Sequence, residues 1–253
     1  MMLYEEREEK IMEQLQLQPV VRVGKLSEQL KVSVDTIRRD LKSMEKKGLI
    51  KYVHGGACLP DKVSPYLNFN GREIVHIGLK RKVAEKALPL IRPGMTIALN
   101  SGTTNLILAQ EMLKLGLDIT VVSNNIAAIS ILMQSGSIHL ISIGGEVDNQ
   151  ERSTYGFQCE TEFRKYYPDI TFLAVNAVNC SDGFTDFRFH EIGIMNLLAE
   201  NSEKVYAVMD SSKLGKRSKR QVFPKSAVDA VIMDDPLSDE VRQKYEQEGI
   251  HII

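Results

Sequence analysis

The chain has few cysteines, and their distribution excludes two common ways of holding a small fold together. Its 253 residues contain three cysteines, Cys58, Cys159 and Cys180, which lie far apart. An odd number without a close pair fits neither a disulfide framework nor a paired zinc knuckle. The histidines show no ligand spacing with the cysteines, so we expect no metal ion and no cofactor. They are His54, His76, His139, His190 and His251.

Long apolar runs are also missing. No run approaches the roughly 20 residues needed to cross a bilayer, and the acidic stretch of residues 1–7 does not resemble a signal peptide. We therefore expect a cytoplasmic protein with no membrane partner. The hydrophobic content of 43% is ample for a buried core, and the length allows one large or two modest domains.

The net charge is small, but the charges are unevenly distributed. The whole chain carries a formal charge of −1, whereas residues 20–60 contain nine lysines and arginines and four acidic residues, a local balance of +5. A basic module in a nearly neutral chain indicates a polyanionic partner, such as nucleic acid, for that module alone.

The basic stretch contains an amphipathic helix. Ser33 stands where an N-cap is expected, Asp35 adds negative charge to the first turn, and Gly48 offers a stop. Arg38 and Lys42 lie one turn apart on a face that is left free and positive. Apolar residues at helical spacing predict a buried stripe on another face. They are Val34, Ile37, Leu41 and Met44.

The flanking segments complete a winged helix-turn-helix pattern. Residues 4–17 suit a first helix, and residues 25–30 suit a second helix that leads into the Ser33 cap. Residues 48–57 predict a strand and a Gly-Gly turn, as in the wing hairpin. Lys51 and His54 would then be free to approach a phosphate backbone.

This arrangement resembles the DeoR family of bacterial transcription regulators. The resemblance rests on Thr36-Ile37-Arg38-Arg39-Asp40-Leu41, followed by Gly48-Leu49-Ile50 and His54-Gly55-Gly56-Ala57. It implies an N-terminal winged helix-turn-helix domain and a larger C-terminal domain that senses a small metabolite, commonly a phosphorylated sugar. We expect the DNA-binding residues to be Arg22, Ser33, Asp35, Thr36, Arg38, Arg39, Lys42, Lys51 and His54.

The remaining chain predicts a second, α/β domain. Residues 59–71 are rich in turn formers and are interpreted as a linker between a DNA-binding domain of residues 1–58 and a sensor domain of residues 72–253. Short β-rich runs then alternate with helical patterns, which predicts a Rossmann-like, mostly parallel sheet with helices on its faces. Expected strands cover residues 95–99, 119–122, 138–143, 170–178, 205–209 and 228–233. Expected helices cover residues 72–91, 104–115, 126–134, 158–166 and 189–201.

Polar residues follow several of these strands, at the edge where parallel sheets bind ligands. The segment Asn100–Thr104 follows the first strand and opens a helix, so its amides and hydroxyl groups favour an anion. Taken alone, Ser-Gly-Thr-Thr is about as often only a capped turn. Residues 123–125, 144–146 and 210–213 end further strands and bring more polar groups to the same rim.

These loops also resemble DeoR sensor motifs, so the resemblance covers nearly the whole chain. It implies a domain related to ribose-phosphate isomerase, in which the comparable loop cradles the sugar phosphate and Lys213 would be the cationic phosphate partner. We expect the effector-binding residues to be Asn100, Ser101, Gly102, Thr103, Thr104, Asn124, Gly144, Gly145, Asn176 and Lys213.

Three segments depart from the family pattern, at five positions. Asn100 stands where the family usually has Asp, Asn176 and Asn179 stand where acidic residues are usual, and Met195-Asn196 replaces a Lys-Arg pair. Hydrogen bonding to a ligand survives these changes, but a carboxylate base does not. We therefore expect an effector with one anionic end and a neutral, hydroxyl-bearing remainder, rather than a bisphosphate.

Two functions follow from these patterns. The first is a transcription regulator, expected to repress a carbohydrate-utilisation operon, that binds double-stranded operator DNA as a homodimer or homotetramer and responds to a sugar phosphate or related metabolite. The alternative is a sugar-phosphate isomerase with an appended DNA-binding module. Such an enzyme needs a base, and the obvious positions hold asparagines. We therefore predict a regulator without enzymatic activity. The acidic residues left for catalysis are Glu146, Asp182, Asp186 and Glu191.

Overall fold

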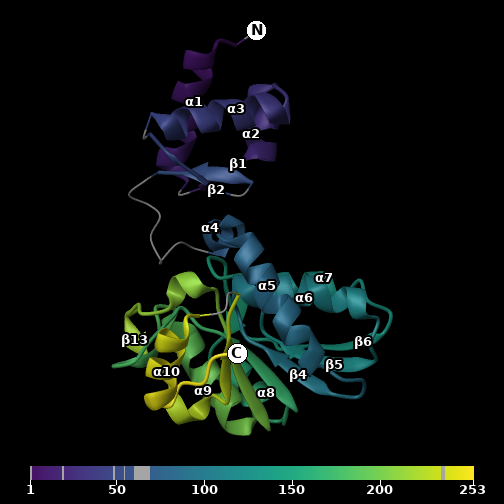
Figure 1. Ribbon diagram of the computed structural model, residues 1–253. Helices are drawn as coiled ribbons and strands as arrows, with labels where there is room; N and C mark the ends of the chain where they lie inside the picture. The colour runs from purple at the N-terminus through teal and green to yellow at the C-terminus, as the bar shows by residue number, and fades with distance from the viewer. Residues whose placement is uncertain (1, 19, 48, 54, 60–68, 235–236) are drawn as a thin grey trace. The chain divides into compact units, whose positions relative to one another are not determined.

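The computed structural model describes two units of the chain. It covers residues 2–18, 20–47, 49–53, 55–59, 69–234 and 237–253. The contacts divide the chain into residues 1–77 and residues 78–253, and Figure 1 shows the elements of each. Residues 72–77, expected in the second domain, are therefore grouped with the first unit.

Three helices form the core of the first unit. They are α1 (Tyr4–Leu17), α2 (Val23–Leu30) and α3 (Val34–Lys46). Ile37, Leu41 and Met44 of α3 are fully buried, as predicted from their spacing, and pack with apolar residues of α1 and α2. Val34 is 38% exposed, so its predicted burial is wrong. The first turn of α3 projects beyond the core, because Ser33 and Asp35 are exposed as well.

A small antiparallel sheet provides the wing. Its strands are β1 (Val20–Arg22), β2 (Lys51–Val53) and β3 (Gly56–Cys58), in the order β1-β3-β2. Val53 pairs with Gly56, and Gly55 adopts a positive φ of 83°, which glycine tolerates because it has no Cβ. Gly56 therefore belongs to a strand rather than to the turn. The predicted Gly48 stop and His54 lie outside the described residues.

Two helices replace the single one predicted over residues 72–91. They are α4 (Phe69–Ile74) and α5 (Ile77–Ala87), followed by a short 3-10 helix, η2 (Leu88–Leu90). His76 has a φ of 57°, and this left-handed conformation interrupts a right-handed helix. Since α4 begins at Phe69, the last three residues of the expected linker are helical. Residues 60–68 of that linker lie outside the described residues.

The second unit is built on six parallel strands, which confirms the predicted α/β fold. Their spatial order is β14-β12-β9-β4-β5-β6. All five strand pairs are parallel, for example Leu99 beside Ser123 and Leu99 beside Phe172. The strands are β4 (Thr96–Leu99), β5 (Ile119–Ser123), β6 (Ile138–Ser142), β9 (Ile170–Ala174), β12 (Lys204–Val208) and β14 (Ala230–Ile232).

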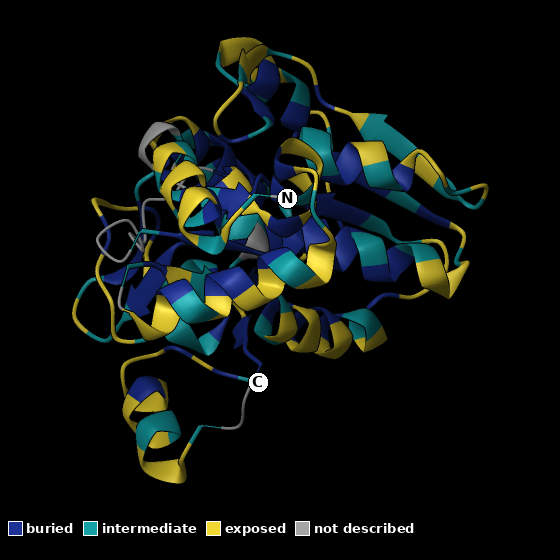
Figure 2. Ribbon diagram, turned by 90° about the horizontal axis from the view of Figure 1, so that it is seen from above, coloured by how far each residue is buried: buried dark blue, intermediate teal, exposed yellow. Residues whose placement is uncertain are grey.

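Helices cover both faces of this sheet. The chain moves outward in one direction from β4 to β6 and in the other from β9 to β14, and right-handed crossovers then place their helices on opposite faces. Accordingly, α6 packs beside α7 and α8 beside α9 (Figure 1). The strands are largely buried, α6 has no exposed residue, and α7 and α8 each carry exposed residues on an outer side (Figure 2). These helices are α6 (Thr103–Met112), α7 (Ile126–Leu132), α8 (Phe157–Phe163) and α9 (Ile192–Asn201).

Smaller elements extend the loops around the sheet. The strand predicted over residues 170–178 is divided, because β9 ends at Ala174 and β10 then pairs antiparallel with β11. The additional strands are β7 (Glu146–Asp148), β8 (Ser153–Tyr155), β10 (Ala177–Asn179), β11 (Gly183–Asp186) and β13 (Arg220–Gln221). The additional helices are η3 (Leu113–Leu115), η4 (Phe189–Glu191), η5 (Ser211–Lys213), η6 (Lys225–Ala227) and α10 (Asp239–Gln247). Within the described ranges, every helix is too short or too polar to cross a lipid bilayer.

Candidate functional site

The exposed face of α3 carries most of the predicted DNA-binding residues. The Ser33 side chain accepts a hydrogen bond from the Thr36 amide at 3.2 Å, which confirms it as the N-cap. Arg38, Arg39 and Lys42 are exposed, and Arg38 Nη1 lies 3.2 Å from Asp35 Oδ1. Both partners of this pair are more than half exposed, so the pairing is weak and leaves the arginine able to exchange partners.

The other predicted DNA-binding residues lie on the sheet of the first unit. Lys51 is exposed on β2. Arg22, at the end of β1, forms an ion pair with Glu73 of α4. Arg22 is therefore engaged within the protein, whereas Lys51 faces solvent beside the hairpin.

A buried ion pair fixes the opposite side of the recognition helix. Arg7 Nε donates to Asp40 Oδ2 at 2.6 Å, and Arg7 Nη2 donates to Asp40 Oδ1 at 3.0 Å. This two-point contact joins α1 to α3. The sequence analysis missed it, although Asp40 has the same helical spacing as the buried Ile37 and Met44. In Arg38-Arg39-Asp40 the two arginines face outward and the aspartate faces the core.

The predicted anion loop lies where the strand order of the second unit reverses. Ser101 and Gly102 follow β4, and the next strand on the side of the reversal is β9. Ligands bind at this position in open α/β sheets. Gly102 has a φ of 146° and precedes α6, and a Cβ added there would lie 2.6 Å from the Ala174 Cβ atom. Only glycine allows this close approach.

Asn100 is used inside the protein. Its side chain is fully buried, its Nδ2 donates to the Ala174 carbonyl at 3.2 Å, and its Oδ1 accepts the Ala174 amide at 2.8 Å. Asn105 Nδ2 donates to the same Oδ1 atom at 3.0 Å. Asn100 therefore joins β4 to β9 beneath the loop. The direct effector contact predicted for its side chain does not fit this geometry, because both ends of its amide are occupied.

Arg188 holds the underside of the same loop. Its guanidinium donates to the carbonyls of Ser101 and Ala174, both at 2.6 Å, and to both carboxylate oxygens of Asp186 at 2.7 and 3.0 Å. The Asp186 carboxylate raises the pKa of Arg188 against the opposing effect of burial. The sequence analysis did not select Arg188, because nothing in its local pattern distinguishes it from a surface arginine.

Glu191 forms a second buried connection to the loop. Its Oε2 accepts the Ser101 amide at 3.3 Å, and its Oε1 accepts Asn124 Nδ2 and Ser153 Oγ, both at 3.0 Å. Burial raises the pKa of Glu191 to about 7, although the charge of Arg188 and the hydrogen bonds from Ser153 and Asn124 lower it. Asn124 was predicted from its position after β5. Glu191, which lies 67 positions later in the chain, joins it to the loop.

Three buried polar atoms near this loop have no hydrogen-bond partner among the described residues. They are Thr104 Oγ1 and Asn105 Oδ1, in the first turn of α6, and Asn124 Oδ1. Thr104 is 1% exposed and Asn124 is fully buried. Buried polar atoms are usually paired, so unpaired ones mark a place where a polar ligand would be stabilised.

Asn176 and Lys213 lie at the ends of the neighbouring strands. Asn176 follows β9, and its backbone N–H donates to Asp186 Oδ2 at 2.9 Å. It therefore contacts the carboxylate that also binds Arg188. Lys213 lies in η5, after β12, and its Nζ donates to the Val175 carbonyl at 3.4 Å. The parallel order β12-β9-β4 therefore brings Lys213, Asn176 and the Ser101 loop to one edge of the sheet.

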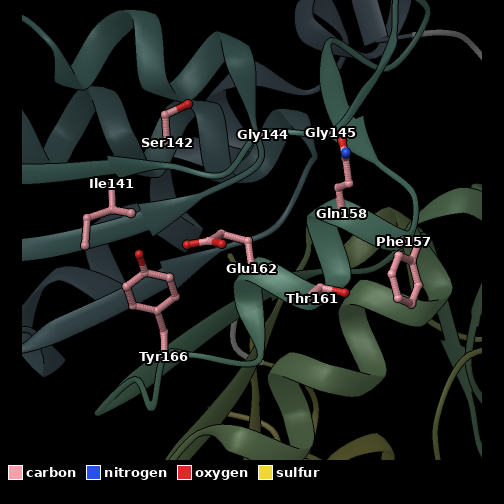
Figure 3. Close-up of a pocket in the computed structure, with 9 residues that line it drawn as sticks. All are labelled: Ile141, Ser142, Gly144, Gly145, Phe157, Gln158, Thr161, Glu162 and Tyr166. Carbon is pink, nitrogen blue, oxygen red and sulfur yellow. The ribbon is translucent and has the colours of Figure 1, made fainter.

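Gly144 and Gly145 line a different pocket. It has a volume of about 490 Å³ and lies between the end of β6 and α8, with Ile141, Phe157 and Tyr166 among its lining residues (Figure 3). None of the other predicted effector residues lines it. Gly145 has a φ of 146°, and a Cβ there would lie 2.5 Å from the Tyr155 carbonyl oxygen, so tight packing explains this glycine.

The remaining departures from the family pattern lie inside the second unit. Met195 of α9 is fully buried. Asn196 Nδ2 donates to the carbonyls of Ile192 and Val222, at 2.8 and 2.9 Å. Neither supplies a positive charge to the loop. Among the described residues, no group of three or more histidine, cysteine, aspartate or glutamate side chains is arranged to hold a metal ion.

Two family descriptions match the chain. Residues 75–235 match "DeoR C terminal sensor domain", and residues 7–63 match "DeoR-like helix-turn-helix domain". Together they account for most of the sequence, and their boundaries follow the two units described above.

Named relatives match over almost the whole chain. A provisionally named aga operon transcriptional repressor of Escherichia coli O157:H7 is 30% identical over 98% of this chain and 93% of its own. The HTH-type transcriptional regulator GolR of Listeria innocua is 30% identical over 98% and 97%. The glycerol-3-phosphate regulon repressor of Escherichia coli K12 is 29% identical over 91% of each chain. All three are named as regulators, which supports the regulator over the isomerase.

Solved structures with a partial likeness include ribose 5-phosphate isomerase A. The enzyme from Methanocaldococcus jannaschii is 21% identical, with a TM-score of 0.40 over 54% of each chain. The enzyme from Neisseria gonorrhoeae is 18% identical, with a TM-score of 0.42 over 56% of each chain. At these values the likeness carries no information about activity.

Proposed function

Because the chain belongs to the DeoR family of transcription regulators, we propose that it represses a carbohydrate-utilisation operon and that a phosphorylated sugar or related anionic metabolite changes its operator affinity. The observation that supports the regulatory part is the loop at the strand reversal, where Gly102 provides no side-chain cap for α6 and buried polar atoms lack a hydrogen-bond partner among the described residues.

We assign operator recognition to α3. Arg38 and Arg39 are the proposed base-reading residues, and Ser33, Lys42 and Lys51 the proposed phosphate contacts. This division is supported by the exposed, positively charged face of α3 and by the Arg7–Asp40 pair that fixes its other side. Arginine reads guanine through two hydrogen bonds in the major groove, whereas lysine neutralises phosphate charge.

The proposed effector site consists of the Ser101–Thr104 loop, Asn124 and Lys213. The loop amides and the Lys213 ammonium group favour an anionic end of the ligand, and the unpaired Thr104 Oγ1 and Asn124 Oδ1 favour hydroxyl groups beside it. Met195 and Asn196 add no second positive charge. The ligand therefore carries one anionic group and a neutral, hydroxyl-bearing remainder, rather than two phosphates.

The proposed mechanism is thermodynamic coupling between ligand and operator. A homodimer or homotetramer presents two recognition helices, and the operator selects the arrangement that matches its half-site spacing. An effector that binds another arrangement more tightly lowers operator affinity. The largest possible change is the ratio of the effector's affinities for the two arrangements. Couplings of about 1–3 kcal/mol change affinity roughly 5- to 150-fold.

A thermal-shift screen of sugar monophosphates, sugar bisphosphates and the matching neutral sugars tests the ligand class. A ligand at about 100 times its Kd should add about 2.7 kcal/mol to the free energy of unfolding. We expect monophosphates to stabilise the protein and neutral sugars to have no effect. Stabilisation by neutral sugars alone, or by bisphosphates in preference to monophosphates, would contradict the proposed site.

A further inference from the structure

Glu191 accepts a hydrogen bond from the Ser101–Thr104 loop, in which we place the anion. Its Oε2 atom accepts the Ser101 amide, the first donor of the loop, at 3.3 Å. The carboxyl group is 1% exposed, and its other oxygen is held by Asn124 and Ser153. The loop is thus in contact with an acidic group that belongs to the protein itself.

The charges around Glu191 do not compensate it fully. The charge of Arg188 lowers the pKa of Glu191, but the hydrogen bonds of Arg188 go to Asp186 and to the carbonyls of Ser101 and Ala174. Burial keeps the pKa of Glu191 at about 7, so the group can change charge near neutral pH. The other titratable groups that face this cluster from β11, the loop before β8, and α8 are Asp186, Glu151, Cys159 and Glu160.

We propose that Glu191 sets the charge that the effector site accepts, because an anion binds the Ser101–Thr104 loop only together with a proton on Glu191. This inference rests on the proposed placement of the effector at that loop. An ionised Glu191 and a bound anion would be two negative charges beside one amide in a site closed to water. Proton uptake from solvent by the Glu191 carboxylate removes this repulsion and leaves a neutral acid under the ligand.

The coupling has a defined pH signature. Below the pKa of Glu191 the site is already neutral and anion affinity is insensitive to pH. Above that pKa each anion takes up one proton, so affinity falls about tenfold for each pH unit. A site in which Glu191 only positions the loop would show neither proton uptake nor this slope.

Calorimetric titration with inorganic sulfate tests the proposal, because sulfate keeps a constant charge between pH 6 and pH 8.5, in contrast to phosphate. In the full-length parent we expect the sulfate affinity at pH 8 to be at least fivefold lower than at pH 6. Titrations in two buffers of different ionisation enthalpy should show uptake of about one proton at pH 8.

Three variants make the test specific. In Glu191→Gln the affinity should be independent of pH, with no proton uptake and tighter sulfate binding at pH 8 than in the parent. Ser153→Ala removes a hydrogen bond that favours the ionised form, so the midpoint of the pH profile should move to higher pH while proton uptake remains. Glu162→Gln, a change in a partly buried carboxylate of α8 that pairs with Lys165, is the matched control and should behave like the parent.

The outcomes separate this inference from the proposed function. Sulfate binding that is lost in Lys213→Ala but is independent of pH in the parent would keep the effector site and refute the role of Glu191. An unchanged midpoint in Ser153→Ala together with a pH profile retained in Glu191→Gln would refute it as well. Absence of sulfate binding to the parent at every pH would count against the anion site itself.

Discussion

The first turn of α3 and the loop that opens α6 both lie at the N-terminus of a helix, but the charged residues around them differ in burial and in pairing. Around α3 the charged groups are exposed and weakly paired, as in Arg38 and Asp35. Around α6 they are buried and joined by several short contacts, as in Arg188 and Asp186. The first arrangement leaves charges free to exchange partners with DNA. The second fixes the geometry of the proposed effector loop in the interior of the fold.

The difference predicts very different sensitivities to loss of an arginine. Arg188→Met should lower the free energy of unfolding by about 3–5 kcal/mol, because it leaves Asp186 buried without its partner. Arg38→Met, which removes an exposed arginine, should change it by about 0–1 kcal/mol. Chemical denaturation of both variants measures the contrast. Equal losses would show that the two regions do not differ as described.

A second contrast concerns pH. Glu191 has a pKa of about 7 in the folded protein, above its ordinary value of 4.5, so the folded state binds more protons between these values. The stability it contributes is complete below pH 4.5 and is lost as the pH rises to 7. Relative to Glu191→Gln, the parent should therefore lose roughly 3 kcal/mol of unfolding free energy across this window. A parallel pH dependence in parent and variant would rule out the raised pKa.

Substitutions on the exposed face of α3 should change the affinity for operator DNA rather than the free energy of unfolding. Operator sequences selected from a random library with the parent provide the substrate. Arg38→Ala and Arg39→Ala should each cost about 1–3 kcal/mol of binding free energy and relax the preference at one base pair. Lys42→Ala should weaken all sequences alike and reduce the salt dependence. Unchanged affinity in both arginine variants would remove α3 from the base contacts.

The smallest expected effect is at the cap of α3. Ser33→Ala removes the side-chain acceptor of the Thr36 amide and should lower the free energy of unfolding of the first unit by about 1 kcal/mol. Ser43→Ala, in the last turn of the same helix and away from its N-terminus, is the matched control and should have little effect. Denaturation followed by far-ultraviolet circular dichroism can resolve the difference. If Ser33→Ala lowered the free energy of unfolding by no more than Ser43→Ala does, the Ser33 cap would be dispensable.

Local patterns revealed the exposed region much better than the buried one. The cap at Ser33, the charged face and three of the four predicted buried positions of α3 depend on residues within one or two turns, so helical spacing was sufficient to predict them, whereas Val34 is exposed. In the second unit, the order of the strands depends on the handedness of the crossovers and on contacts between residues far apart in the chain. The loops at the strand ends could be predicted, but Arg188 and Glu191 reach the Ser101 loop from 87 and 90 residues away.

Asn100 and the Gly144–Gly145 pair have contacts that the sequence did not reveal, for the same physical reason. Asn100 was expected to face a ligand, yet β4 and β9 lie side by side and Ala174 takes its amide. Gly144 and Gly145 were expected to join the same rim, but β6 is the last strand of the sheet and they line a separate pocket beside α8. In both cases the residue type was informative and its partner could not be deduced without the fold.

Fluorescence anisotropy of a selected operator can measure whether an anion bound at the Ser101–Thr104 loop controls operator binding. The affinity is measured with and without the monophosphate that gives the largest thermal shift. We expect this ligand to change the operator Kd by about 5- to 150-fold in the parent. In Lys213→Ala and Thr103→Val the change should be lost at the same ligand concentration, while ligand-free operator affinity stays near that of the parent. The same ligand response in both variants would contradict the account.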